Sequence, residues 1–290
     1  MRLTRGALLA IASAVCFGSL GVFVKLAHAE GWNDPSLLAV RFALASVTIL
    51  PFALRARSAP RLFGAAFLIG AIGYAATTAM YFPSFRYLPT AVASFLLYLA
   101  PALVALLATL FLRERLGRRG LAALALALAG LALLASGAFT GELSLVGVAL
   151  ATGSAVSYAA TTVLARSVAQ RMPWSHLTLG VSLGAAASFT LFSVATRQLA
   201  VPPGTRALLW ALGIGVLATG VSLSLFFAAL GRASASHVSV ISTLEPVSTL
   251  VLAAFFLAEI PSWLGIAGGA LILGGAALIA AQEPIVAPHE

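Results

Sequence analysis

Residues 101–114 read PALVALLATLFLRE, and residues 246–259 read PVSTLVLAAFFLAE. Each stretch begins with a proline, continues through apolar residues and reaches a glutamate 13 positions later. A proline within a helix removes one backbone donor and bends the helix, here freeing the carbonyls of Leu97 and Ser242. The same bent, apolar helix is therefore predicted twice in one chain.

The repetition extends well beyond these two stretches. An offset of 145 pairs Gly120 with Gly265, and an offset of 141 pairs Gly6 with Gly147 and Lys25 with Arg166. Each half contains five long apolar runs, so the second copy must cross a membrane in the opposite direction to the first. Inverted repeats of this kind are typical of secondary transporters, in which two similar halves can exchange roles as inner and outer gate.

The composition excludes a water-soluble protein. Of 290 residues, 61% are apolar and 9% are charged, and the mean hydropathy is +1.05. An ordinary soluble domain has roughly 25% charged residues. Although the net charge is +9, the basic residues lie in short clusters between apolar runs, as topology signals do. The sequence thus excludes a cytosolic enzyme, a nucleic-acid binder and a disordered chain, and predicts an integral membrane protein.

Ten apolar runs are long enough to span a bilayer, which needs about 20 helical residues. The first run follows Arg2 and Arg5, but it is longer than a signal-peptide core, and we interpret it as a retained helix. The predicted spans are 5–27, 35–54, 62–82, 90–112, 119–137, 145–166, 175–196, 207–228, 235–257 and 262–281. The predicted fold class is all-α, with a first five-helix repeat over 1–137, a connecting loop over 138–144, a second repeat over 145–281 and a tail over 282–290.

Basic residues predict the orientation of these spans. With the N-terminus inside, the inner segments carry twelve arginines, whereas the outer loops carry only Arg86, Arg197 and Arg206. The inner arginines are Arg2, Arg5, Arg55, Arg57, Arg61, Arg113, Arg115, Arg118, Arg119, Arg166, Arg171 and Arg232. The positive-inside rule then places both termini in the cytoplasm and the protein in the cell (inner) membrane.

The sequence around 112–116, LRERL, follows a proline-bearing helix and resembles the end of the fourth helix in EamA-type transporters. RYLPTA at 86–91 and VRF at 40–42 fit the same pattern, and FLAE at 256–259 fits it a second time. The chain thus resembles the ten-helix drug/metabolite transporter superfamily over nearly its whole length. Ile260 and Pro261 replace the polar pair that follows the glutamate in that pattern, so the resemblance assigns no role to Glu259. Within the superfamily the chain looks most like amino-acid and metabolite exporters, of which the YddG-type aromatic amino-acid exporters are one branch.

Two charged residues are predicted to lie deep in the membrane. Glu245 is about 15 Å into the ninth span, and Arg41 is about six residues into the second. Ionisable groups at such depths are costly and normally face a substrate pathway or a partner. Glu245 could contact a substrate amine, carry a proton or form a structural pair. Arg41 could bind a substrate carboxylate or pair with Glu245.

Polar and aromatic residues recur at helical spacing on several other spans. They predict a substrate pathway, although serine and threonine also join helices in membranes. The candidate pathway residues besides Glu245 and Arg41 are Tyr74, Thr78, Tyr81, Tyr98, Ser154, Tyr158 and Ser242. Pro101 and Pro246 are candidate hinges because both copies of the repeat retain them.

These features predict a secondary transporter that exports a small metabolite by alternating access through a central cavity. An aromatic or other neutral amino acid is the favoured substrate. A channel-like pore, or a transporter of drugs or phosphorylated sugars, remains an alternative. No enzyme motif and no metal-ligand spacing is present, so we expect no enzyme activity and no cofactor. The expected partners are a small-molecule substrate and the lipid bilayer, with no nucleic acid, and the protein is expected to be a monomer or homodimer.

Overall fold

In a computed structural model, the described residues 3–84, 86–88, 90–136, 144–202, 204–258 and 262–281 form helices and no strand. Ten helical segments are long and apolar enough to cross a membrane. They agree with the ten predicted spans to within a few residues, so the all-α, ten-span prediction is confirmed. The predicted tail, 282–290, and all but the last residue of the predicted connecting loop lie outside the described residues.

Three of the first five spans are uninterrupted helices, and the third and fourth are divided. The first half comprises α1 (Arg5–Ala29), α2 (Asp34–Ala53), a third span of α3 (Pro60–Leu68), the π-helical η1 (Ile69–Tyr74) and α4 (Ala75–Ser84), a fourth span of α5 (Thr90–Leu97) and α6 (Ala100–Phe111), and α7 (Arg118–Ala135).

The second half repeats this plan, with the third and fourth of its spans divided in the same way. It comprises α8 (Leu145–Ala169), α9 (Trp174–Ala195), an eighth span of α10 (Thr205–Leu212), the π-helical η3 (Gly213–Val221) and α11 (Ser222–Leu230), a ninth span of α12 (Ala235–Ser242) and α13 (Leu244–Leu257), and α14 (Trp263–Ala280).

Local sequence explains where several helices begin. A serine, threonine or asparagine precedes the first turn and accepts a hydrogen bond from a backbone N–H that has no partner within the helix. Thr4 accepts from Ala7, and Asn33 accepts from Ser36. Ser144, Ser234 and Ser262 cap α8, α12 and α14 in the same manner.

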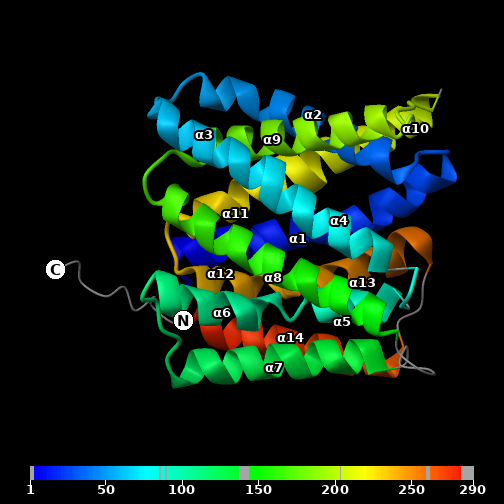
Figure 1. The fold of residues 1–290 in the computed structure, drawn as a ribbon. Coiled ribbons are helices and arrows are strands. Elements are labelled where there is room, and N and C mark those ends of the chain that lie inside the picture. The colour runs from blue at the N-terminus through cyan, green and yellow to red at the C-terminus, as the bar shows by residue number, and fades with distance from the viewer. Residues whose placement is uncertain are drawn as a thin grey trace.

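The helices run side by side across the molecule (Figure 1), and each half packs against the other reciprocally. α1 contacts α11 and α13, whereas α8, which occupies the corresponding place in the second half, contacts α4 and α6. α2 packs against η3 while α9 packs against η1. α2 also contacts α9, and α7 pairs with α14 at one edge of the bundle. The interior is therefore built from both halves together.

Glycine permits the closest of these contacts. A Cβ atom at Gly130 on α7 would lie 2.5 Å from the carbonyl oxygen of Gly268 on α14. A Cβ at Gly184 on α9 would lie 2.0 Å from the carbonyl oxygen of Phe67 on α3. Any larger residue at these two positions would force the helices apart.

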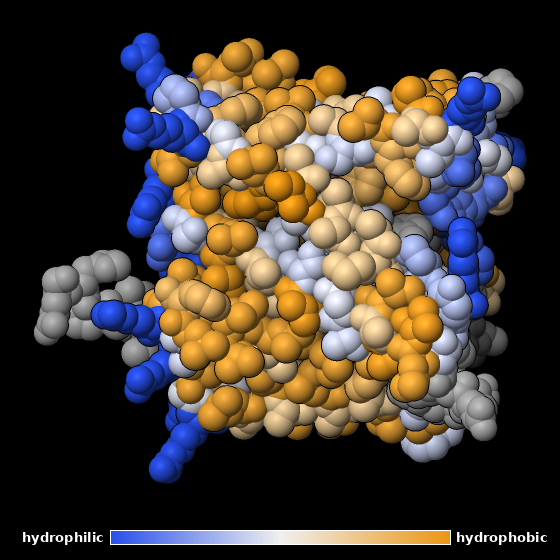
Figure 2. All heavy atoms as spheres, in the orientation of Figure 1, coloured by the Kyte–Doolittle hydropathy of each residue, from blue (hydrophilic) through white to orange (hydrophobic). Residues whose placement is uncertain are grey.

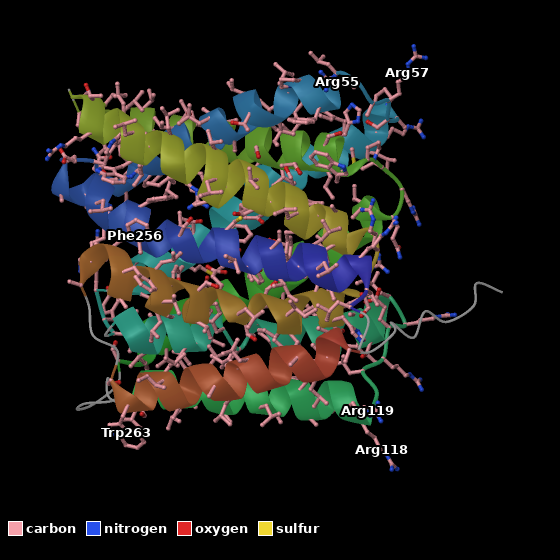
Figure 3. The ribbon with its side chains drawn as sticks, turned by 180° about the vertical axis from the view of Figure 1, so that it is seen from behind. Arg55, Arg57, Arg118, Arg119, Phe256 and Trp263 are labelled. Atoms are coloured by element: carbon pink, nitrogen blue, oxygen red, sulfur yellow. The ribbon has the colours of Figure 1, made fainter. Side chains whose placement is uncertain are left out.

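The two ends of the bundle differ in charge. Arg55, Arg57, Arg118 and Arg119 project from one end, which we call the arginine end, whereas Phe256 and Trp263 lie towards the other (Figure 3). Apolar side chains cover most of the surface between the two ends (Figure 2). This distribution suits a multi-pass membrane protein whose middle faces lipid.

The fourth and ninth spans are interrupted close to their prolines. α5 ends at Leu97 and α12 ends at Ser242, the two residues whose carbonyls the prolines were predicted to leave without a helical donor. Pro101 and Pro246 then lie in the first turns of α6 and α13, where a proline costs no helical hydrogen bond. Each span is therefore two half-helices joined near its centre.

Candidate functional site

Five of the predicted pathway residues meet near the breaks in the fourth and ninth spans. Arg41 comes from α2, Tyr74 from the end of η1, Tyr98 from the α5–α6 junction, Tyr158 from α8 and Glu245 from the first turn of α13. The side chain of Glu245 interacts electrostatically with all four of the others. We call these five residues the central cluster. Both halves of the chain contribute to it.

Glu245 is held in place by its backbone and by a tyrosine. Its carboxyl group forms a side-chain hydrogen bond with the Tyr98 hydroxyl, which donates. Gly18 of α1 lies directly against this turn, because a Cβ there would come within 3.0 Å of the Glu245 carbonyl oxygen. The Thr249 hydroxyl also donates to the Gly18 carbonyl oxygen at 3.0 Å. The helix N-terminus favours a negative charge at this position.

Arg41 is the positive member of the central cluster. Its guanidinium carbon lies 4.7 Å from the centre of the Phe42 ring, a cation–π contact. Phe42 in turn packs against Tyr74 and Phe189, with ring centres 5.9 and 5.7 Å apart. Gly215 of η3 allows α2 to approach, because a Cβ there would lie 3.2 Å from the Arg41 carbonyl oxygen.

Arg41 and Glu245 attract each other without direct contact. No ion pair within 4.0 Å joins these two described residues, although each interacts electrostatically with the other. The Nε atom of Arg41 is buried and has no hydrogen-bond partner among the described residues. A buried donor without a partner is energetically costly, so it marks a place where an acceptor would be stabilised.

A small pocket adjoins Tyr74 and Tyr158 of the central cluster. Its volume is about 10 Å³, roughly the space of one water molecule. Its lining combines hydroxyl groups with aromatic rings and consists of Tyr74, Thr77, Tyr158, Thr161, Thr162, Ala165, Phe226 and Phe227. Tyr74 and Tyr158 are among the predicted pathway residues, and Thr77 and Thr161 belong to the same polar and aromatic stripes of the sequence. The two phenylalanines could not be distinguished from ordinary lipid-facing residues by sequence alone.

The remaining predicted pathway residues lie in different surroundings. The Tyr81 hydroxyl is 2.8 Å from the Ser94 hydroxyl, and Tyr81 also interacts electrostatically with Glu245. Ser154 is fully buried, and its hydroxyl donates to the Thr77 carbonyl oxygen of the adjacent α4 at 3.0 Å. The Ser242 hydroxyl donates to Val238 on its own helix. Thr78 is half-buried on α4.

A buried ion pair lies at the arginine end. Arg166, at the end of α8, donates from Nε to Glu114 at 2.9 Å, and the side chains are only 5% and 13% exposed. Glu114 also accepts from the backbone N–H of Ala235 at 2.8 Å, and Arg166 donates to the Leu230 carbonyl oxygen. The pair therefore ties together the ends of α6, α8, α11 and the start of α12. The repeat pattern pairs Arg166 with Lys25 and Glu114 with Glu259. It did not predict that Arg166 and Glu114 contact each other.

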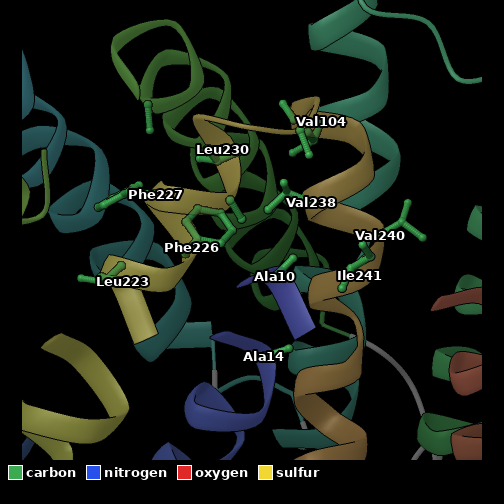
Figure 4. Packing of buried hydrophobic residues seen from close by; sticks show 14 of the residues in the cluster. Ala10, Ala14, Val104, Leu223, Phe226, Phe227, Leu230, Val238, Val240 and Ile241 are labelled. Atoms are coloured by element: carbon green, nitrogen blue, oxygen red, sulfur yellow. The ribbon is translucent and has the colours of Figure 1, made fainter. Parts of the chain in front are cut away.

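Apolar packing lies between this ion pair and the central cluster. Leu223, Phe226, Phe227 and Leu230 of α11 belong to one buried cluster with Val238 and Ile241 of α12. Phe226 lies on the side of α11 that faces Val238, whereas Leu223 and Phe227 point away from α12 (Figure 4). Ala10 and Ala14 of α1 and Val104 of α6 complete the contact. All of these residues are at most 1% exposed except Phe226, which is 3% exposed. These described side chains are therefore almost entirely shielded from solvent.

Ten membrane-spanning helices around a charged and aromatic centre define a multi-pass membrane protein of the transporter type. The sequence pattern of the EamA-like transporter family matches residues 4–136 and again residues 145–281. The chain therefore belongs to the EamA-like transporter family.

Individual relatives agree with this assignment. An uncharacterized transporter of Archaeoglobus fulgidus is 30% identical over 275 residues, covering 94% of this chain and 95% of that protein. The uncharacterized transporter YvbV of Bacillus subtilis is 30% identical over 193 residues, covering 65% of this chain and 62% of its own length. A protein of known crystal structure, 23% identical, has the same fold, with a TM-score of 0.82 over 96% of each chain. Family and relatives indicate a transporter rather than an enzyme.

Proposed function

We propose that the protein is a secondary transporter that exports a small zwitterionic metabolite of the amino-acid class by alternating access. The observation that carries this proposal is the pair of opposite charges in the central cluster, Arg41 and Glu245, which attract each other but are not in contact. A free amino acid has a carboxylate and an ammonium group on one carbon. Such a substrate could place its carboxylate on Arg41 and its ammonium group on Glu245 at the same time.

The chemistry of each side chain suits one end of such a substrate. A guanidinium binds a carboxylate through parallel N–H donors, and Arg41 has a buried Nε that lacks a protein partner among the described residues. The Glu245 carboxylate can accept hydrogen bonds from an ammonium group. Tyr74 and Phe42 offer aromatic faces beside Arg41, which favours an aromatic or other neutral side chain. A phosphorylated sugar would call for more cations than the one arginine of the central cluster.

Alternating access is supported by the reciprocal packing of the two halves. In our proposal the halves are inverted repeats, and the arginine end faces the cytoplasm together with both termini, in the inner membrane. The Arg166–Glu114 pair and the apolar contact beside it form the closed gate of the described state. Opening towards the cytoplasm would separate α6 and α8 from α11 and α12, with the half-helix junctions at Pro101 and Pro246 acting as hinges.

Counterflow in proteoliposomes tests the proposal. Vesicles loaded with an unlabelled neutral amino acid, such as phenylalanine, should accumulate the labelled form transiently from outside, and the rate should saturate. A screen of the neutral amino acids would identify the preferred side chain. Flux that neither saturates nor shows counterflow would instead establish a channel-like pore. Counterflow of drugs or phosphorylated sugars but of no amino acid would overturn the substrate assignment.

Glu245→Gln tests the role of the carboxylate, with Glu30→Gln at the end of α1 as the matched control. Glutamine keeps the shape but removes the charge. Loss of a charge-assisted hydrogen bond to substrate should weaken binding by about 1.5–3 kcal/mol, or roughly 10- to 150-fold. If Glu245 instead carries protons, the pH dependence of transport should flatten while exchange of substrate for substrate persists. Wild-type affinity and pH profile with only stability lost, restored by replacing Arg41 as well, would refute both roles.

A further inference from the structure

A second pocket lies far from the central cluster, at the arginine end of the bundle. It is an open groove of about 450 Å³ between α1, α9, α11 and the turn that follows α11. Its lining is apolar along the helices and basic at its end, and consists of Arg5, Leu8, Leu9, Trp174, Ser224, Leu225, Ala228 and Arg232. No step of the proposed transport cycle uses these residues.

Close helix packing brings the two arginines to the same mouth of the groove. A Cβ atom at Gly6 would lie 2.9 Å from the Cβ of Ala233 and 3.5 Å from the backbone of Arg232. The first turn of α1 therefore lies directly on the turn that follows α11. The Arg232 side chain folds back along the groove, because its Nη1 donates to the Ala228 carbonyl oxygen at 2.9 Å. Arg5 remains exposed beside it.

We propose that this groove binds one anionic phospholipid, with the headgroup phosphate between Arg5 and Arg232 and the acyl chains along Leu8 and Leu225. Two like charges side by side at a membrane surface repel each other unless an anion lies between them. A basic pocket between spans, next to lipid-facing apolar side chains, is the arrangement that recognises anionic headgroups. Trp174 lies in the same groove, and its amphipathic ring is suited to the headgroup level.

The internal repeat supplies a comparison within the same chain. At the repeat offsets of 141 and 145, Arg5 corresponds to Val146 and Arg232 corresponds to Tyr87. The close contact itself is kept there, because a Cβ at Gly147 would lie 2.7 Å from Tyr87 and Leu88 side-chain atoms. The close helix contact thus occurs both at Gly6 and at its repeat counterpart Gly147. Of these two contacts, only the one at Gly6 has a pair of cations beside it. Because the helices pack closely at Gly147 without such cations, helix packing does not explain Arg5 and Arg232. An anionic ligand would explain them.

Thermal unfolding of the purified protein in a neutral detergent tests the proposal. Dioleoyl phosphatidylglycerol should raise Tm, and dioleoyl phosphatidylcholine at the same concentration should raise it much less. The double variant Arg5→Gln, Arg232→Gln should lose more than half of the shift produced by phosphatidylglycerol. The matched control is Arg55→Gln, Arg57→Gln, which removes the same charge from the same end outside the groove and should keep the shift (Figure 3).

Further arms separate the possible outcomes. Arg5→Lys, Arg232→Lys keeps the charge and should retain most of the shift, which also guards against a glutamine variant that fails to fold. Inorganic phosphate alone should leave Tm unchanged, because it lacks acyl chains for the apolar part of the groove. An equal shift with inorganic phosphate, an equal shift with phosphatidylcholine, or equal losses in the groove and control variants would each overturn the proposal. None of these outcomes bears on substrate transport.

Discussion

The two halves of the ninth span differ in their surroundings although they belong to one run of apolar sequence. Seven of the eight residues of α12 are buried, whereas Leu244 and Ala253 are the buried residues among the 14 of α13. α12 packs against α1, α6 and α11 next to the Glu114–Arg166 pair. Glu245, the second residue of α13, is only half-buried. The break at Thr243 thus separates an almost entirely buried segment from one in which most residues are half-buried or exposed.

In the transport cycle proposed above, this difference corresponds to a carrier that is closed at the arginine end. A substrate held at the break would be separated from the arginine end by the apolar residues of α11 and α12 and by the ion pair. The same residues would have to part for release at that end. The comparison between α12 and α13 therefore yields predictions about stability, transport and accessibility, each of which would change in a different way if the closed end were merely structural.

The largest effect on stability is expected from breaking the ion pair. Glu114→Gln leaves the buried Arg166 guanidinium without its counter-charge, and loss of one partner of a buried pair costs about 3–5 kcal/mol. Thermal or denaturant unfolding in detergent measures this loss. Replacing Arg166 with glutamine as well should recover part of it. A Tm unchanged in the single variant would mean that the pair does not hold the arginine end closed.

The next effect concerns the junction itself. Pro246→Ala restores a backbone donor for the Ser242 carbonyl and allows α12 and α13 to join into one helix. We expect transport to slow about tenfold, equivalent to about 1.4 kcal/mol in the barrier, while insertion and folding persist. The equivalent change Pro101→Ala in the fourth span should act in the same direction. Unchanged kinetics in both variants would identify the bends as architectural.

Cysteine labelling compares the two segments directly. In a Cys16→Ala background, Ser248→Cys on α13 should react with a water-soluble maleimide, because Ser248 is half-buried on the polar side of the helix. Ser239→Cys on α12 should be protected, since Ser239 is 3% exposed. Adding Glu114→Gln should raise the labelling of position 239 from the arginine end. Equal labelling of both positions without that change would remove the distinction between the segments.

Much of this fold follows from the sequence because the bilayer imposes one rule on every span. Apolar length alone located the ten helices, and the repeated Pro101 and Pro246 located the breaks in two of them. The π-helical segments η1 and η3 were not predicted, since Ile69–Tyr74 and Gly213–Val221 are apolar runs like their neighbours. Such a change in hydrogen-bond pattern depends on contacts with other helices rather than on local composition.

The site was only partly predictable for a similar reason. A charge in the middle of a span is so costly that Glu245 and Arg41 stand out in any apolar sequence. The Glu114–Arg166 pair lies near the span ends, where charges are common, and its two members are 52 residues apart. The neighbourhood of Arg5 and Arg232 depends on a single close contact at Gly6. Contacts between residues so far apart in the sequence can be identified only from the three-dimensional arrangement of the helices.

The smallest expected effect distinguishes helix contact from substrate contact at Ser154. Its hydroxyl donates to the Thr77 carbonyl oxygen across the α4–α8 interface, in a fully buried position. Interhelical hydrogen bonds in membranes contribute about 0.6 kcal/mol on average, so Ser154→Ala should lower stability by about that amount and leave substrate affinity unchanged. Ser167→Ala, which removes a hydroxyl bonded within α8 itself, is the control. A rise in KM without loss of stability would show that Ser154 turns towards the substrate during the cycle, and would extend the pathway from the central cluster along α8.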